Sequence, residues 1–478
     1  MQHQFKQSLS LTDATLIVAG SMIGSGIFIV SADISRTLGS SGWMLATWIL
    51  AGLLTVAAAL SYGELAGMFP KAGGQYVYLR EAYNPFIAFI YGWTVFTVIQ
   101  SGAIAAVAVA FAKFAAYFFP FFSEKNILFH INFLNFSFSG AKLLAIASLI
   151  IITLINLNGI DTGKWVQRVF TFTKIFAIFI IIILGLTISF NKEIFSQNWT
   201  NPFLAMQKDA LGQSFQISGM ALFAAFGTAM VGSLFSSDAW NNVTFIAGEI
   251  KNPMKNIPLS LLLGTLIVSI IYILTNIAYT ALLPLQGSVG YGNVLYQGIQ
   301  HAEADRVGSA AASVIFGNYG GAIMAALIII STFGCNNGLI ISGSRLYYAM
   351  ALDGLFFKEA AILNPKGVPK FAMIAQLIWC SILCLSGSYN ALLTYTIFAA
   401  LLFYILTIVG VFILRKKQPN TPRPYKVWAY PLMPIIYIVV AFIITLILFI
   451  YKPENTIPGI AIVLAGIPVY YILHNNKK

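Results

Sequence analysis

The chain has 478 residues, of which 59% are hydrophobic and only 9% are charged, and its formal net charge is +12. About a quarter of the residues of a soluble domain are usually charged, so this composition excludes a soluble globule and indicates a chain that crosses a membrane many times. The Lys and Arg form no basic stripe and lie in short connections between apolar runs, where they act as orientation signals, so we expect no nucleic acid partner.

Twelve apolar runs are long enough to span a membrane. They cover roughly residues 12–38, 43–69, 83–119, 139–159, 164–190, 216–250, 257–283, 316–352, 372–388, 390–414, 428–451 and 456–473. The first and sixth runs are interrupted by small and polar residues, and each opens a block of five, a pattern typical of inverted repeats with a site between the halves. We therefore predict an all-α polytopic membrane protein with twelve transmembrane helices. Its first repeat covers residues 1–190, its second covers residues 216–415, and two further helices lie in 428–473.

The first run contains the stretch Gly20-Ser21-Met22-Ile23-Gly24-Ser25-Gly26. Glycine costs a helix interior about 1 kcal/mol relative to alanine, so this stretch predicts a break in the helix. Unwound backbone in hydrocarbon is tolerated only where it lines a cavity, which makes the break a candidate binding site. A half-helix that begins near Ser25 would offer free N–H groups and a positive dipole end to a carboxylate. The alternative is close helix packing through Gly20 and Gly24, a small-xxx-small spacing.

Lys174 lies inside the fifth run, six residues after Arg168 at the boundary of the run. Six helical residues place it roughly 9 Å deep. An ionisable side chain at that depth is a functional candidate by default, and the alternative is a stem that snorkels to the interface.

The sixth run is interrupted by Ser236-Ser237-Asp238-Ala239-Trp240-Asn241, directly after Phe235. Ser, Asp and Asn compete for backbone hydrogen bonds, so they favour a second break that frees the carbonyl of Phe235 and its neighbours. Donors at one break and acceptors at the other match the carboxylate and the ammonium of an amino acid. Asp238 either faces the substrate or caps the second half of the helix, and we favour the cap.

Several motifs in order resemble the amino acid–polyamine–organocation transporters and, within them, the L-type amino acid transporter branch. The resemblance covers nearly the whole chain. The motifs are Gly24–Phe28, Glu64-Leu65 with Phe69–Tyr76, Asp238–Asn241 with Glu249–Pro253, Ser344–Tyr347 with Asp353-Gly354, and Arg423–Val427.

The resemblance implies a secondary transporter of L-amino acids that works by alternating access, by exchange or with protons, and that is not an enzyme. Alternatives are a polyamine or cationic amino acid antiporter of the same fold, or a transporter-like amino acid sensor. The N–H groups of Ser25 and Gly26 would hold the carboxylate, and the carbonyls of Met22, Phe235 and Asp238 would take the amino group. Phe235 would also cover the site as a gate.

The remaining candidate residues follow from the two breaks and from the resemblance. We include Ile23 of the first break and Trp240 and Asn241 of the second among the substrate-binding residues. Lys174 resembles an internal cation that stands where sodium-driven relatives bind an ion, bridging helix one to helix five. By this resemblance Lys174 would take the place of the ion that drives transport, so we do not expect transport to depend on sodium.

Charged residues near the predicted cytoplasmic ends suggest a gate of ion pairs. Glu64 and Arg345 are the main candidates, with Glu249 and Arg80 beside them, and the alternative is a set of solvated interfacial charges. Most Lys and Arg lie on the side of the amino terminus, so both termini are expected in the cytoplasm, with the protein in the cytoplasmic membrane.

Partners and cofactors are expected to be few. The four His are scattered and suggest no metal site, and we expect no cofactor. Animal members of the resembled branch pair with a glycoprotein through a cysteine in an outer loop, but residues 120–138 contain no cysteine. No disulfide-linked ancillary subunit is therefore expected, and the partners are an amino acid and the lipid bilayer.

Overall fold

The computed structural model describes residues 7–131, 136–208, 213–290, 293–386 and 389–475. In this part of the chain eleven helical spans are long and apolar enough to cross a membrane, which confirms a polytopic helical membrane protein. They are α1 with α2 (Leu11–Met22, Gly26–Leu38), α3 (Ser41–Met68), α5 with α6 (Pro85–Thr94, Gln100–Ala115), α7 (Gly140–Leu157), α8 (Ile160–Leu186), α10 (Gly219–Ser236), α12 (Pro253–Leu282), α15 (Gly320–Leu352), α17 (Tyr389–Lys417), α18 (Leu432–Tyr451) and α19 (Pro453–Asn475). The ninth predicted run forms a shorter apolar helix, α16 (Lys370–Ser386).

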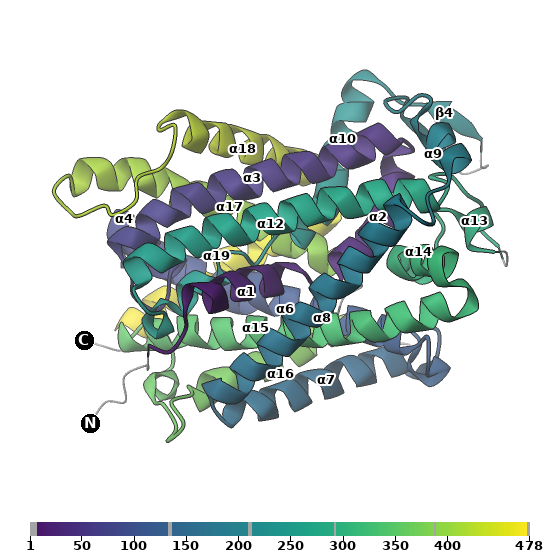
Figure 1. Ribbon diagram of the computed structural model, residues 1–478. Coiled ribbons are helices and arrows are strands. Elements are labelled where there is room, and N and C mark those ends of the chain that lie inside the picture. The colour runs from purple at the N-terminus through teal and green to yellow at the C-terminus, as the bar shows by residue number, and fades with distance from the viewer. Residues whose placement is uncertain (1–6, 132–135, 209–212, 291–292, 387–388, 476–478) are drawn as a thin grey trace.

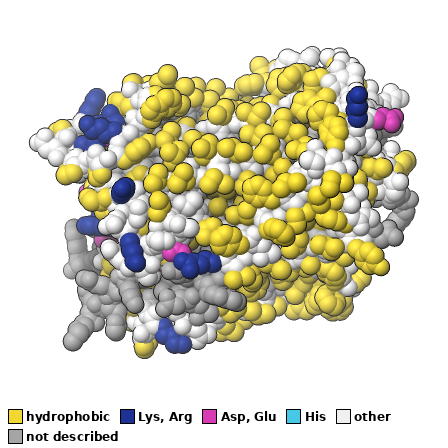
Figure 2. Space-filling model, viewed as in Figure 1, with side chains coloured by type: hydrophobic (Ala, Val, Ile, Leu, Met, Phe, Trp, Pro, Cys, Tyr) yellow, Lys and Arg dark blue, Asp and Glu magenta, His cyan; other side chains and the backbone are white. Residues whose placement is uncertain are grey.

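The long helices form one bundle, with the two ends of the chain at the same end of it (Figure 1). Helix α12 packs along α3 and α1, helix α15 packs against α6 and α8, and helix α10 packs against α2. On the face of the bundle that Figure 2 shows, apolar side chains cover most of the middle, and most of the visible Lys and Arg lie toward the end that carries the termini. An apolar belt with charged ends is the surface that a bilayer requires.

Short elements lie between the long helices, and apart from α11, which continues the interrupted sixth run, they were not expected from the sequence. Two antiparallel hairpins pair β1 with β2 and β3 with β4. Figure 1 shows α9, α13, α14 and β4 at the end opposite to the termini. The short elements are α4 (Gln75–Ala82), α9 (Lys192–Trp199), α11 (Asn242–Phe245), α13 (Val294–Gln297), α14 (Val307–Phe316), β1 (Ile127–Ile131), β2 (Phe136–Ser139), β3 (Met206–Lys208) and β4 (Ser214–Gln216).

The third predicted run is also irregular, although we expected no break there. A π-helical segment, η1 (Val95–Ile99), joins α5 to α6. Such segments occur mostly as single turns inside α-helices, often at functional sites. Here η1 contributes Val95 and Ile99 to the wall of a small central cavity.

Candidate functional site

The predicted break in the first helix is present. Helix α1 ends at Met22, and Ile23 leaves helical geometry with φ −75° and ψ 86° before α2 begins at Gly26. The first N–H groups of a helix have no acceptor within that helix, and they carry the positive end of its dipole. The start of α2 therefore presents the N–H groups at Ser25 and Gly26, with the positive end of the helix dipole, to the interior of the bundle.

Gly26 is the point at which the two breaks touch. A Cβ added at Gly26 would lie 2.1 Å from the Oγ of Ser236 and 3.1 Å from its Cα. Gly24 is less crowded, because an added Cβ would lie 3.1 Å from the Sγ of Cys335. The alternative of helix packing through Gly20 and Gly24 therefore does not account for Gly26, whose missing side chain lets the start of α2 approach the end of α10.

The second break is also present, and it corrects one expectation. Helix α10 ends at Ser236, Ala239 has a left-handed backbone with φ +64°, and α11 begins at Asn242. The N-terminal cap of α11 is Asn241, whereas the carboxylate of Asp238 accepts a hydrogen bond of 2.5 Å from the hydroxyl of Tyr404. The expected capping role of Asp238 is wrong, because Asp238 lies too early in the chain and points toward α17.

The carbonyl ends of the two breaks share a hydrogen-bond donor that sequence reasoning missed. The hydroxyl of Tyr272 on α12 lies 2.9 Å from the carbonyl oxygen of Met22 and 3.0 Å from that of Ser236. The carbonyl of Phe235 accepts from the N–H of Asp238 at 3.1 Å. The carbonyl of Met22 also accepts from the N–H of Gly24 at 2.8 Å. A carbonyl oxygen has two lone pairs and the hydroxyl has one proton to donate, so the two oxygens together keep acceptor capacity.

Lys174 is fully buried on α8 and contacts the first break directly. Its Nζ donates to the carbonyl of Ile23 at 2.7 Å and also to that of Gly20. The side chain therefore does not snorkel toward the interface, as the alternative required. It places a cation where the helix break has freed backbone oxygens, and it joins α8 to α1.

Two aromatic side chains close the site toward the end opposite to the termini. The ring of Phe235 is buried and makes an edge contact with the ring of Tyr389, with centroids 6.3 Å apart. The hydroxyl of Tyr389 lies 3.0 Å from the Oγ of Ser25. Phe235 and Tyr389 thus lie together beside the start of α2, and Tyr389 had no role in our prediction.

A cavity of about 10 Å³ lies beside the second break, with space for about one water molecule. Its polar lining comes from Asp238, Asn241, Gln75, Gln100 and Tyr404, among others. The amide oxygen of Gln75 accepts from Asn241 at 3.0 Å and from the hydroxyl of Tyr91 at 2.9 Å. Asn241 is thereby fixed at the cavity wall.

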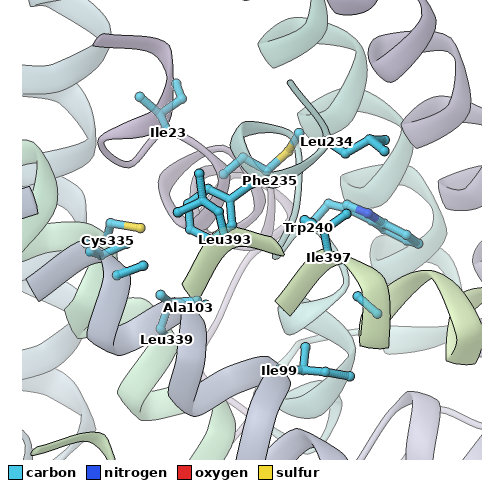
Figure 3. Close-up of a cluster of buried hydrophobic side chains, with 14 of the residues drawn as sticks. Ile23, Ile99, Ala103, Leu234, Phe235, Trp240, Cys335, Leu339, Leu393 and Ile397 are labelled. Carbon is cyan, nitrogen blue, oxygen red and sulfur yellow. The ribbon is translucent and has the colours of Figure 1, made fainter. Parts of the chain in front are cut away.

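The rest of the wall around the breaks is apolar. Helices α6, α15 and α17 contribute a buried cluster next to Ile23 and Phe235, drawn in Figure 3 with Ile99, Ala103, Cys335, Leu339, Leu393 and Ile397. Trp240 is buried at the edge of this cluster, where its ring packs edge-on against Tyr62 with centroids 4.7 Å apart. Trp240 therefore supports the second break by packing.

The two main gate candidates do not pair with each other. The Nε of Arg345 lies 3.0 Å from a carboxylate oxygen of Glu249, and both side chains are buried. The carboxylate of Glu64 is held instead by Arg415, at 2.7 and 2.9 Å, and by Arg423 at 3.3 Å. Arg80 contacts Asp353. The structure thus provides ion pairs near the termini, with partners that the sequence did not identify.

Comparisons with known proteins agree with this geometry. Residues 9–473 match the family model described as amino acid permease. The chain belongs to the amino acid permease family. The serine/threonine exchanger SteT of Bacillus subtilis is 31% identical over 475 residues, covering 99% of this chain and 98% of the relative.

Mammalian transporters are similar over the same length. The large neutral amino acids transporter small subunit 2 of Homo sapiens is 30% identical, covering 98% of this chain and 80% of the relative. The b(0,+)-type amino acid transporter 1 of Mus musculus is 29% identical, covering 98% and 88%. This permease is therefore an amino acid transporter and not an enzyme, as the motifs predicted.

Proposed function

We propose that this permease exchanges small neutral L-amino acids across the cytoplasmic membrane by alternating access. The contact of Gly26 with Ser236 supports the proposal most directly, because it brings the N–H donors at the start of α2 next to the carbonyl ends of both breaks. A ligand with a carboxylate and an ammonium on one carbon satisfies both sets. The relative SteT, whose name describes a serine/threonine exchanger, adds support for exchange.

The lining of the site supports short side chains. The central cavity is small, its polar wall includes Asp238 and Asn241, and its apolar wall includes Ile99 and Leu339. A methyl or hydroxymethyl group needs little additional space there, whereas a large ring would require the helices to move apart. We therefore propose alanine, serine and threonine as substrates, bound by Met22, Ile23, Ser25, Gly26, Phe235, Asp238, Trp240 and Asn241.

Lys174 is proposed to replace a coupling ion. Its ammonium already satisfies the carbonyls of Gly20 and Ile23, the oxygens that an unwound helix would otherwise offer to a bound cation. Sodium is then not needed to stabilise the break. Exchange, or transport together with a proton, remains as the source of energy.

The helical order supports inverted repeats in residues 1–190 and 216–415, with 428–473 outside them. In this arrangement both termini lie in the cytoplasm, the pair Glu249–Arg345 is part of the inner gate, and Phe235 with Tyr389 forms the outer one. The segment around β1 and β2 contains no cysteine, and Cys335, Cys380 and Cys384 are buried, so we propose that no ancillary subunit is attached by a disulfide.

The test is exchange by the purified protein in proteoliposomes loaded with unlabelled alanine. We expect uptake of labelled serine that needs internal amino acid and proceeds equally in sodium and choline media. Ethylamine and propionate should not compete, because leaving either set of buried groups unpaired costs about 1–3 kcal/mol or more. Preferential uptake of arginine or putrescine would instead support a cationic antiporter, with Asp238 as the cation partner. Binding without any transport would support a sensor.

A further inference from the structure

A second cavity, of about 600 Å³, lies above the covered site at the end opposite to the termini. Its wall includes the outer ends of α6 and α7, the β1–β2 hairpin and the start of α17. Tyr389, which covers Ser25, also lines it, so this vestibule and the start of α2 are separated by one side chain. Both signs of charge line the vestibule, on Lys113, Glu124, Lys142 and Asp305.

Lys113 and Asp305 form a long ion pair in this wall. The Nζ of Lys113 lies 3.5 Å from the Oδ2 of Asp305, whereas charge-assisted hydrogen bonds of this type are about 2.7–2.9 Å long. The other oxygen, Oδ1, accepts from Arg36 on α2 at 2.7 Å. Arg36 thus fixes the carboxylate and leaves Oδ2 for a second cation.

The backbone at Asp305 is held in an uncommon conformation. Asp305 has φ +59° and the preceding Ala304 has φ +52°, in the left-handed region that residues other than glycine rarely adopt. Strain of this kind persists only where surrounding contacts hold it, often at ligand sites. Here the strained turn aims the carboxylate of Asp305 at both Arg36 and Lys113.

We propose that Lys113 and Asp305 form an outer receptor site for a zwitterionic α-amino acid, which is occupied before the central site. The carboxylate of the ligand binds the ammonium of Lys113, and its ammonium binds Oδ2 of Asp305. The long ion pair between Lys113 and Asp305 is thereby replaced by two short ion pairs with the ligand. The ligand and the residue pair each have a net charge of zero, so their charges match. The proposal rests on the proposed function, because it assigns the entry step of the same transport.

The position of Lys113 provides a route to the central site. Its Nζ lies 6.0 Å from the centre of the Tyr389 ring, and the hydroxyl of Tyr389 lies 3.0 Å from the Oγ of Ser25. When Tyr389 moves aside, a carboxylate on Lys113 needs to pass only this side chain to reach the start of α2. Lys142, by contrast, donates to the backbone carbonyls of Ser137 and Leu385 and so holds two segments of the vestibule wall together.

The first experiment measures exchange from both sides in proteoliposomes of known orientation. We expect Lys113→Met to raise the external KM for alanine about tenfold, the effect of losing one charge-assisted hydrogen bond, while kcat and the internal KM stay within about twofold. Lys125→Met is the matched control, because it removes an exposed lysine from the same end of the molecule, and it should change neither KM. An unchanged external KM, or an equal rise on both sides, would overturn the proposal.

The second experiment detects the outer site without transport. Ile127 is 54% exposed and lines the vestibule, so Ile127→Cys provides a thiol whose modification by a maleimide is read from the labelled peptide. With the central site blocked by Gly26→Val, alanine should slow this modification, and propionate and ethylamine should not. Adding Lys113→Met should abolish the protection, and protection that persists refutes the outer site. If the native protein exchanges no amino acid, the proposed function fails by itself, while this protection still decides the outer site.

Discussion

Replacing Gly26 should abolish substrate binding without preventing insertion into the membrane. A Cβ at this position would lie 2.1 Å from the Oγ of Ser236, so Gly26→Ala requires the two breaks to separate by roughly 1 Å. A displacement of this size lengthens the hydrogen bonds from α2 to the carboxylate beyond useful range. Losing two such bonds, each contributing about 1.5–3 kcal/mol, lowers the affinity about 100-fold or more. Gly26→Val adds two methyl groups in the same place and should remove measurable binding.

The assay is equilibrium binding of labelled alanine to the purified protein, with the melting temperature measured in parallel. Ser236→Gly supplies a rescue, because in the double variant with Gly26→Ala the nearest contact of the new Cβ becomes the Cα of residue 236, at 3.1 Å. We expect the double variant to recover at least tenfold in affinity. Gly24→Ala is the matched control in the same break and should lose less than about fivefold. Native affinity in Gly26→Val would refute the reasoning, and so would a double variant as weak as Gly26→Ala.

Three further predictions concern the groups around the breaks. Lys174→Ala should lower the exchange rate at least tenfold in sodium and choline media alike, because two backbone carbonyls lose their donor, each costing about 1–3 kcal/mol. A native exchange rate in this variant would show that Lys174 has no role in transport. Tyr272→Phe should weaken alanine binding about threefold to tenfold in the same binding assay, with the melting temperature within a few degrees of native. An unchanged affinity would show that the hydroxyl of Tyr272 does not contribute to the site. Glu249→Gln removes the carboxylate that pairs with the buried Arg345, so it should destabilise the inner closure by about 3–5 kcal/mol. A cysteine reagent added from the inner side should then label Cys335 faster than in the native protein.

Features that depend on composition along one segment could be predicted from the sequence. The glycines of the first break and the Ser and Asp of the second disfavour a helix locally, and both breaks occur in the predicted stretches. Lys174 stood out because a lysine amid apolar residues is expensive in a membrane. The structure shows where its ammonium finds partners, at the carbonyls of Gly20 and Ile23.

Features that depend on contacts between distant segments could not be predicted in the same way. Tyr272 and Tyr404 lie in apolar runs and Tyr389 lies between two of them, where a tyrosine looks like any other aromatic residue until its hydroxyl meets a partner from another helix. The pairing of Glu64 with Arg415 joins residues 351 positions apart, and no local pattern identifies such a partner. The short hairpins were missed because they lie between membrane segments, where hydropathy gives no signal.

The hydrogen-bonding groups at the two helix breaks also affect whether the protein exchanges amino acids or transports them in one direction. The N–H groups at Ser25 and Gly26 point out of the start of α2, whereas the carbonyl of Met22 accepts from the N–H of Gly24 and that of Ser236 from the hydroxyl of Tyr272. Reorientation of the empty carrier passes through a closed state in which these groups are shielded from water. The two unpaired N–H groups, at about 1–3 kcal/mol each, raise that barrier by about 2–6 kcal/mol, which slows the empty step about thirtyfold or more. An amino acid satisfies all of these groups at once, so the loaded carrier reorients quickly in both directions. In the role proposed for Lys174, its ammonium takes the carbonyls of Gly20 and Ile23 in place of a sodium ion. No ion then relieves the empty state, and the proposal favours exchange of one amino acid for another.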